Sequence, residues 1–137
     1  MTTTTTRLTL TLDGADQVMA AAMQFAAEKG WSATVCVTDA CGVPLIRRRT
    51  GDAWAASVEI SIGKAASAIR FGRPTGALED MINGGRTAFV GTADGTPLRG
   101  GVPVTLDGSV VGAIGVSGLT PDRDEQVALA GAAAFGA

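Results

Sequence analysis

The stretch that decides the fold is residues 102–117, VPVTLDGSVVGAIGVS. Asp107-Gly108 is a strong hairpin-turn signal, and β-branched residues are frequent on both sides of it. The second arm, 109–117, is nearly continuously apolar, which predicts a central strand covered on both faces. Two glycines of this arm, Gly112 and Gly115, fall on opposite faces of the strand. They predict close approach of a helix or of another backbone.

The rest of the chain supplies a second hairpin and four helices. Two further strands are predicted at 33–38 and 43–49, joined by a turn at 39–42. Helices are predicted at 13–29, capped by Asp13, at 55–71, at 75–82, and from Pro121, capped by Thr120, toward the C-terminus. Residues 8–12 alternate apolar and polar side chains, which fits a short edge strand or an extended lead-in. We therefore expect an α+β fold with a central antiparallel sheet of about five strands and helices packed against it.

The composition fits one folded domain. Hydrophobic residues make up 46% of the 137 residues, and charged residues only 18%, which is enough apolar surface to build a core. We expect residues 1–7 to be a flexible N-terminus and residues 8–137 to form the single domain. No stretch has the character of a signal peptide or the length of a membrane span. We therefore expect a cytoplasmic protein without a membrane partner.

The charge pattern argues against nucleic acid as a partner. The formal net charge is −2, and the one basic run is Arg47-Arg48-Arg49. Such a short run is more typical of the polar part of a strand than of a surface that follows phosphates. Cys36 and Cys41 fit a reducing compartment, and we expect free thiols; the alternative is a disulfide or metal clip across the turn between them.

The sequence contains no histidine and no tyrosine. Catalytic Ser-His-Asp and Cys-His pairs are therefore excluded, as is histidine ligation of zinc or haem iron within one chain. Two cysteines without histidine make a poor zinc site, so we expect no metal site. Acid–base chemistry near pH 7 would have to use Asp, Glu, Lys or Cys side chains.

Basic residues in unusual settings are the candidate functional groups. Lys64 lies in an otherwise apolar helix, where a partly buried amine could act as a base or pair with a carboxylate; the alternative is snorkelling to the surface. Gly84-Gly85-Arg86 and Arg99-Gly100-Gly101 each place a guanidinium beside glycine N–H groups, which can hold a carboxylate or phosphate. In the alternative, the glycines only turn the chain and the arginines are solvated.

Two further residues complete the candidate set. Arg73 precedes Pro74 in the bend between two predicted helices and could point into a pocket. Asp124 is most simply a charge at the positive end of the last helix, and we also include it among the ligand-binding candidates. The candidate catalytic residues are thus Lys64 and Arg73, and the ligand-binding candidates are Arg86, Arg99, Gly100, Gly101 and Asp124.

Five segments, in order along the chain, resemble the GlcG/HbpS family, also called the haem-degrading or DUF336 domains. They are residues 37–42 (VTDACG), 64–65 (KA), 71–75 (FGRPT), 100–104 (GGVPV) and 112–124 (GAIGVSGLTPDRD). The resemblance extends over residues 8–134 and implies a profilin-like fold and homo-oligomers. It also implies haem binding in some members, and haem degradation with signalling to a sensor kinase in some extracellular ones. A related domain is appended to certain corrinoid adenosyltransferases.

Our leading hypothesis is a cytoplasmic, oligomeric small-molecule-binding protein. It could also be a cofactor-independent enzyme acting on a small carboxylate-bearing or otherwise polar metabolite. The pocket would lie between the Lys64 helix, the Arg73 bend and the entry to the strand at Gly100-Gly101. Lys64 would be the base or anion partner, and Arg73 and Arg99 would clamp a carboxylate.

Two alternatives remain open at this point. The first is haem binding or degradation with a ligand other than histidine. The available donors are Cys36, Cys41, Met19, Met23, Met81 and Lys64. The second is a non-catalytic structural or accessory interaction domain, for which the alanine-rich last helix would suit a subunit interface.

Overall fold

The computed structural model describes residues 1–91 and 95–136. Its centre is one antiparallel sheet of four strands in the order β2-β1-β4-β3. The strands are β1 (Thr34–Thr38), β2 (Pro44–Arg49), β3 (Gly101–Leu106) and β4 (Ser109–Ser117). The helices are α1 (Leu12–Lys29), α2 (Ala56–Phe71), α3 (Thr75–Asn83) and α4 (Pro121–Ala133), with a short 3-10 helix, η1, at Thr87–Gly91. The α+β class, both hairpins and the four predicted helices are confirmed.

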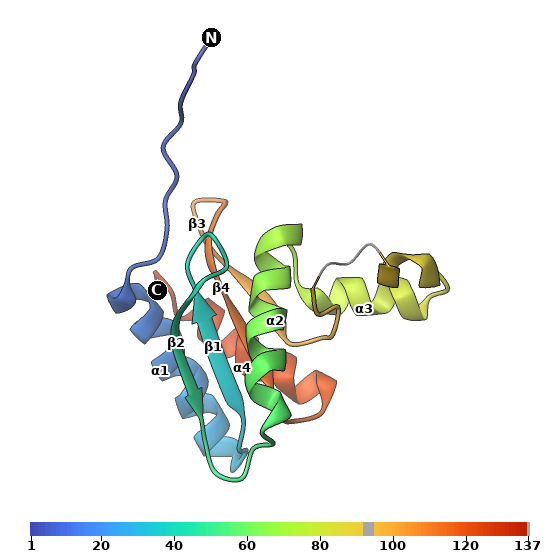
Figure 1. Cartoon of the computed structure of the whole chain (residues 1–137). Helices are drawn as coiled ribbons and strands as arrows, with labels where there is room; N and C mark the ends of the chain where they lie inside the picture. Colours follow the sequence, from blue (N-terminus) through green and yellow to red (C-terminus); the bar gives the residue numbers. More distant parts are fainter. Residues whose placement is uncertain (92–94, 137) are drawn as a thin grey trace.

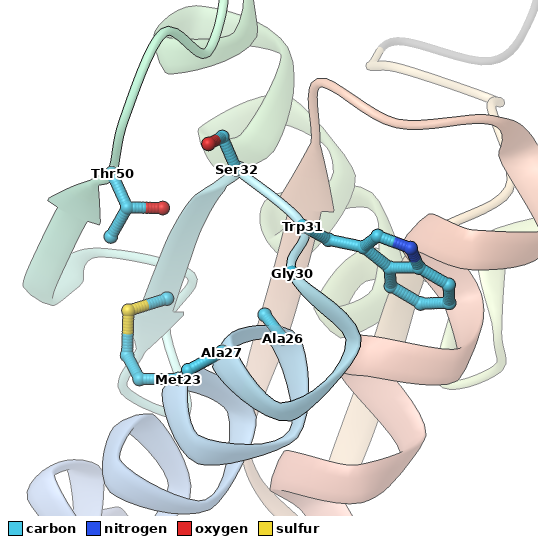
Figure 2. A pocket seen from close by; sticks show the side chains of 7 residues that line it. All are labelled: Met23, Ala26, Ala27, Gly30, Trp31, Ser32 and Thr50. Atoms are coloured by element: carbon cyan, nitrogen blue, oxygen red, sulfur yellow. The ribbon is translucent and has the colours of Figure 1, made fainter.

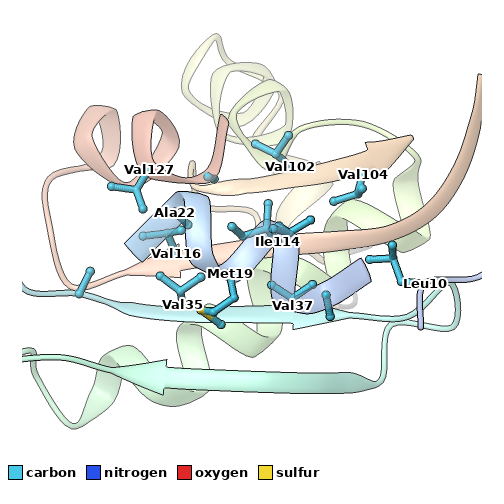
Figure 3. Packing of buried hydrophobic residues seen from close by; sticks show 14 of the residues in the cluster. Leu10, Met19, Ala22, Val35, Val37, Val102, Val104, Ile114, Val116 and Val127 are labelled. Atoms are coloured by element: carbon cyan, nitrogen blue, oxygen red, sulfur yellow. The ribbon is translucent and has the colours of Figure 1, made fainter. Parts of the chain in front are cut away.

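The sheet separates two helical layers (Figure 1). α1 and α4 pack on one face, because side chains alternate along a strand and the larger apolar ones point to this side. Figure 3 shows this core, to which α1 contributes Met19, α4 contributes Val127 and β4 contributes Ile114. α2 packs on the other face, where the strands present small or polar residues; Thr34 of β1, for example, shares a 2.7 Å hydrogen bond with Ser57 of α2.

The predicted fifth strand does not form. Leu10 makes one backbone hydrogen bond toward the sheet, donating its N–H to the Val111 carbonyl at 2.9 Å. The chain enters α1 directly afterwards, so there is no room for a ladder, and the alternative prediction of an extended lead-in holds. The basic run at 47–49 lies exposed in β2, at the edge of the sheet, as expected for the polar part of a strand.

The helix ends follow ordinary capping rules with one correction. Thr11, and not Asp13, caps α1, since its hydroxyl accepts a hydrogen bond from the Gly14 N–H at 3.2 Å. Asp13 instead lies in the first turn, where a carboxylate favours the positive helix end. Thr120 caps α4 as predicted. Of the helices in the described part of the chain, none has both the length and the apolar character that a bilayer-spanning segment requires.

Close packing of α2 on the sheet depends on a glycine of β4. A Cβ atom built on Gly115 would overlap the carbonyl oxygen of Ser61 and lie 2.7 Å from the backbone nitrogen of Ala65, both in α2. On the opposite face, a Cβ on Gly112 would overlap the carbonyl oxygen of Thr38. The predicted close approaches at both glycines are confirmed, and any side chain at 115 would push α2 off the sheet.

We predict that Gly115→Ala lowers the free energy of unfolding by about 3 kcal/mol, because the backbone of α2 cannot yield without loss of packing. Gly91→Ala is the matched control, since a Cβ there would meet open space and the φ angle is not in the left-handed region. Urea unfolding followed by circular dichroism measures both. Equal stabilities of the two variants would contradict the close-packing argument.

Candidate functional site

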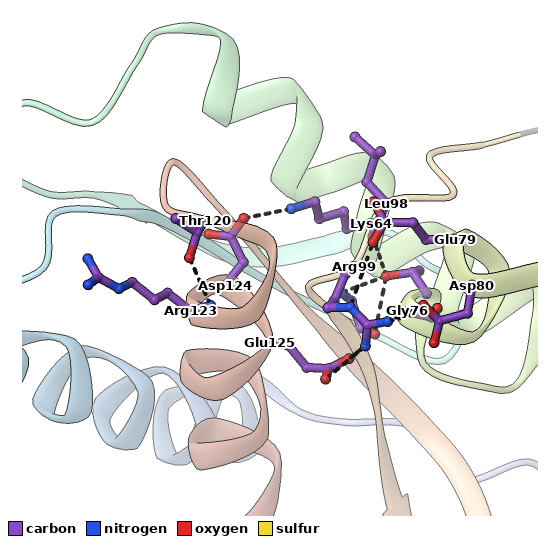
Figure 4. A network of polar contacts seen from close by, with 12 residues as sticks. Lys64, Gly76, Glu79, Asp80, Leu98, Arg99, Thr120, Arg123, Asp124 and Glu125 are labelled. Atoms are coloured by element: carbon purple, nitrogen blue, oxygen red, sulfur yellow. Dashed lines mark hydrogen bonds and ion pairs between the residues drawn. The ribbon is translucent and has the colours of Figure 1, made fainter. Parts of the chain in front are cut away.

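Lys64 is buried, although it carries a charge. It lies in the middle of α2, and 3% of the residue is exposed. Its Nζ donates a hydrogen bond to the carbonyl oxygen of Val116 at 2.8 Å. It donates a second one to Oδ2 of Asp124 at 3.0 Å (Figure 4). The side chain therefore points under the end of β4 toward α4. The snorkelling alternative is excluded by this geometry.

Asp124 completes a buried ion pair with Lys64. It lies in the first turn of α4, positioned by the Thr120 cap, and 3% of the residue is exposed. Its second oxygen, Oδ1, accepts a hydrogen bond from the Leu119 N–H at 3.0 Å. Burial raises the pKa of Asp124, and the Lys64 ammonium and the Leu119 N–H only partly oppose that rise. Asp124 is thus a carboxyl group that accepts a proton more readily than an exposed aspartate.

The glycine pair before β3 makes room for this ion pair. A Cβ on Gly100 would lie 2.9 Å from Nζ of Lys64 and 3.0 Å from Cβ of Asp124. Gly100 also has φ +129°, a conformation that side chains with a Cβ rarely adopt. A Cβ on Gly101 would meet the Lys64 backbone, and the Gly101 N–H donates to the Thr75 hydroxyl at 2.8 Å. These glycines are close-approach residues for the Lys64 side chain and backbone.

Arg99 is surrounded by carboxylates of the chain itself. Its guanidinium contacts Glu79 of α3 at 3.7 Å, Asp80 of α3, and Glu125 of α4 at 3.1 Å (Figure 4). The hydrogen bond with Asp80 is the main cause that raises the pKa of Arg99 above its ordinary value, and Glu125 contributes to the rise. Arg99 therefore joins α3 and α4 in front of β3, with its donors already directed at acidic partners.

A cavity of about 160 Å³ lies beside the ion pair. Its charged lining residues are Lys64, Glu79, Arg99 and Asp124. Its apolar lining residues are Trp54, Ile60, Leu98, Leu119 and Pro121. The volume corresponds to about five water molecules at ~30 Å³ each, below the ~300 Å³ of pockets that enclose drug-sized ligands. The cavity suits a molecule of a few heavy atoms.

The structure brings five of the predicted residues together and leaves two outside. Lys64, Arg99 and Asp124 line the cavity. Gly100 and Gly101 pack closely against Lys64, so all five residues lie near the predicted strand entry. Arg73, in the bend between α2 and α3, and Arg86, after α3, are exposed and do not line it.

Sequence reasoning did not find Trp54, which is 63% exposed and lines the cavity, or the Val116 carbonyl. Trp54 lies ten positions before Lys64 and just outside α2, so no helical spacing connects the two residues. A main-chain carbonyl carries no sequence signal of its own. Only the fold could place these groups beside the lysine.

A second cavity, of about 250 Å³, lies at the C-terminal end of α1 (Figure 2). Met23, Trp31, Ser32 and Thr50 are among its lining residues. None of the residues that line it carries a charge or a nucleophile stronger than a hydroxyl. We therefore place the candidate site at the smaller cavity, where two buried ionisable side chains meet.

Together, the fold and the site define an α+β domain with a small cavity, lined by both charged and apolar residues, where α2, β4 and α4 meet. The chain belongs to the HbpS-like family, described as haem degrading protein HbpS-like, which matches residues 10–133. It is 42% identical to the protein GlcG of Escherichia coli K12 over 112 residues, covering 82% of this chain and 84% of GlcG. The resemblance to the GlcG/HbpS family is confirmed.

Solved structures agree with this assignment. The crystal structure of ORFY of Klebsiella pneumoniae, a DUF336 protein, has a TM-score of 0.91 at 29% identity, covering 100% of this chain and 97% of ORFY. PduOC in complex with haem has a TM-score of 0.81 at 26% identity, covering 94% of this chain and 96% of PduOC.

We predict strong coupling between Lys64 and Asp124. Asp124→Asn should lower the free energy of unfolding by about 3–5 kcal/mol, because it leaves a buried ammonium without its counter-charge. The double variant Lys64→Met/Asp124→Asn removes both charges and should cost less than Asp124→Asn alone. Urea unfolding of the four proteins forms the double-mutant cycle. Additive effects of the two single changes would contradict the pairing.

The stability of Lys64→Met should depend on pH in a defined direction. Without the ammonium, burial raises the pKa of Asp124 against only the hydrogen bond from the Leu119 N–H, so its pKa in the folded protein stays above that of the unfolded chain. The folded state then binds the proton more tightly, and the free energy of unfolding falls as pH rises from the unfolded to the folded pKa. Unfolding of Lys64→Met compared with Lys64→Met/Asp124→Asn across acid to neutral pH measures this. Parallel curves would contradict it.

Proposed function

We propose that this chain is a cytoplasmic, homo-oligomeric protein that binds a small polar metabolite in the cavity beside Lys64 and Asp124. The main support for the proposal is a buried lysine, paired with a buried aspartate, and both residues line this cavity. Burying an ion pair is costly and gives little net stability, so its presence beside a cavity favours a role with a ligand. The same groups could act on the ligand as acid and base without a cofactor.

The charges around the cavity favour an uncharged ligand. The two basic side chains, Lys64 and Arg99, form ion pairs with four carboxylates, those of Glu79, Asp80, Asp124 and Glu125. A ligand carboxylate would therefore enter a region with an excess of negative charge. Of the two predicted kinds of metabolite, we favour the polar, uncharged one. A hydrogen-bond acceptor of this ligand would bind the Lys64 amine. It would not be held by the predicted clamp of Arg73 and Arg99.

The apolar wall supports a ligand with a short carbon skeleton. Trp54, Ile60 and Leu119 line the cavity together with its charged residues. An apolar wall with a few convergent polar groups is the usual composition of a small-molecule site. Trp54 is partly exposed, so it provides an aromatic surface that a ligand can cover.

Ligand binding should change the emission of Trp54. In a Trp31→Phe background Trp54 is the remaining tryptophan. We expect a saturable fluorescence change with small neutral alcohols, amides, aldehydes or ketones, and weaker binding of matching carboxylates. The control is the same background with Lys64→Met/Asp124→Asn, which removes both ionisable groups of the buried pair. Preferential binding of carboxylates, or an unchanged response in the control, would contradict the proposal, and a folded protein that binds none of them would favour the accessory-domain alternative.

Haem is the alternative that the family description raises, and the donors of this chain do not fit it. Met19 and Cys36 are sealed in the core at 1% and 0% exposure, and burial raises the pKa of the Cys36 thiol to about 11. Lys64 lies beside a cavity of about 160 Å³, smaller than the ~300 Å³ of pockets that enclose drug-sized ligands. The remaining donors are the exposed Cys41, which is a free thiol like Cys36, and the thioethers of Met23 and Met81. Among the cavities of the described residues given above, the one at the C-terminal end of α1 is lined by Met23 and by neither Cys41 nor Met81.

A haemin titration tests this alternative directly. We expect no saturable shift of the Soret band at a defined ratio of haemin to chain, because no buried donor is available to the iron. Albumin at equal concentration serves as the positive control for haemin quality, and Met23→Leu tests the donor that lines the cavity at the C-terminal end of α1. A saturable shift that Met23→Leu abolishes would establish haem binding and overturn this expectation.

A further inference from the structure

We propose that Lys64 forms an imine with a small, neutral aldehyde or ketone in the cavity, with Asp124 carrying the protons of the reaction. This inference rests on the proposed function, because the carbonyl compound occupies the same cavity. It goes further by naming the chemical class of the ligand and a covalent step.

The position of the amine fits this chemistry. A buried lysine beside an apolar wall is the setting in which an amine becomes a nucleophile toward carbonyl groups. Nζ of Lys64 has three N–H groups, and two of them donate hydrogen bonds, to the Val116 carbonyl and to Asp124. The third N–H has no acceptor among the described residues, and rotation about the Cε–Nζ bond, once Asp124 has taken a proton, would turn the lone pair of the amine to that position. Gly100 lacks the Cβ that would stand 2.9 Å from this nitrogen.

Asp124 supplies the proton transfers that imine formation needs. Its Oδ2, 3.0 Å from Nζ, first takes a proton from the ammonium and leaves a neutral amine. The amine lone pair forms the C–N bond, and the electron pair of the C=O bond moves to the oxygen, which takes the proton back from Asp124. Asp124 then removes a proton from the nitrogen, giving a neutral carbinolamine.

The second half of the reaction releases water. Asp124 donates its proton to the carbinolamine hydroxyl, the C–O bond breaks, and the nitrogen lone pair forms the C=N bond. The product is a protonated imine with one positive charge, as on the original ammonium, opposite the Asp124 carboxylate. The ion pair is neutralised during the proton transfers and is restored in the product, and no oxidant, reductant or metal is consumed.

The site also explains why the carbonyl compound should be neutral and small. Four carboxylates lie around the cavity and its neighbouring Arg99, so an anionic aldehyde or keto acid would be repelled. The volume of about 160 Å³ accommodates only a short carbon chain. Ile60 and Leu119 would contact that chain and limit access of bulk water to the imine.

The sequence contains its own control, since Lys29 is the one other lysine. Lys29 is exposed at the end of α1, with its Nζ 5.5 Å from the centroid of the Phe25 ring. An aldehyde that reacts with amines only by exposure would label Lys29 and the N-terminal amine first. Preferred labelling of the buried Lys64 is therefore a signature of the site.

The test is reductive trapping of the full chain with acetaldehyde or acetone and sodium cyanoborohydride, followed by intact mass measurement and peptide mapping. We expect one adduct per chain at Lys64, formed faster than at Lys29, absent in Lys64→Arg and unchanged in Lys29→Arg. Asp124→Asn should slow trapping roughly a hundredfold, the lower range for loss of a general acid–base group. Circular dichroism establishes that each variant is folded.

Labelling of Lys29 and the N-terminus with Lys64 unmodified in the folded wild type would overturn the inference, whatever the behaviour of Asp124→Asn. That outcome is separate from failure of the proposed function. If Trp54 fluorescence still reports saturable binding of a neutral compound, the cavity is a non-covalent site and only the imine is lost. If neither readout responds, both proposals fall.

Discussion

The structure depends on a buried ion pair that joins three elements at one end of the sheet. Lys64 of α2 reaches beneath β4 to Asp124 of α4 and also binds the Val116 carbonyl. Removing two charges from water costs several kcal/mol, so each must be matched by hydrogen bonds from its surroundings. The described residues meet this condition, since their buried side-chain nitrogen and oxygen atoms all have partners. This requirement fixes where α2 and α4 lie relative to the sheet.

The surrounding packing follows from that requirement. Gly115 lets the backbone of α2 approach β4, and Gly100 leaves space for the lysine nitrogen. Arg99 holds α3 and α4 together through its three acidic neighbours, on the far side of the glycine pair. The cavity lies beside these charges, and the same contacts that set the helix positions also set its size. Stability and ligand chemistry are therefore coupled through one pair of residues.

Local signals predicted most of the fold and only part of the site. Turn residues and apolar periodicity placed the two hairpins and four helices, because those features act between neighbours in sequence. The prediction of a fifth strand was wrong, because the alternation of apolar and polar side chains before Leu12 does not show that the chain enters α1 directly. Lys64 stood out as a charge in an apolar helix, but its partner lies 60 residues away, so sequence could not decide between burial and snorkelling. Anion binding by Arg99 was predicted for the same reason, because the sequence did not show that three carboxylates from α3 and α4 already surround its guanidinium.

The most direct test of the central claim is nuclear magnetic resonance of protein labelled with ¹³C at the lysine ε-carbons. The two lysines give two signals, and Lys29→Arg assigns them. We expect one signal near that of free lysine, from Lys29, and one displaced signal from Lys64 that moves in Asp124→Asn and on addition of a ligand that fills the cavity. Two signals at the position of free lysine, both insensitive to Asp124→Asn in a folded protein, would contradict the buried pair and the site built on it.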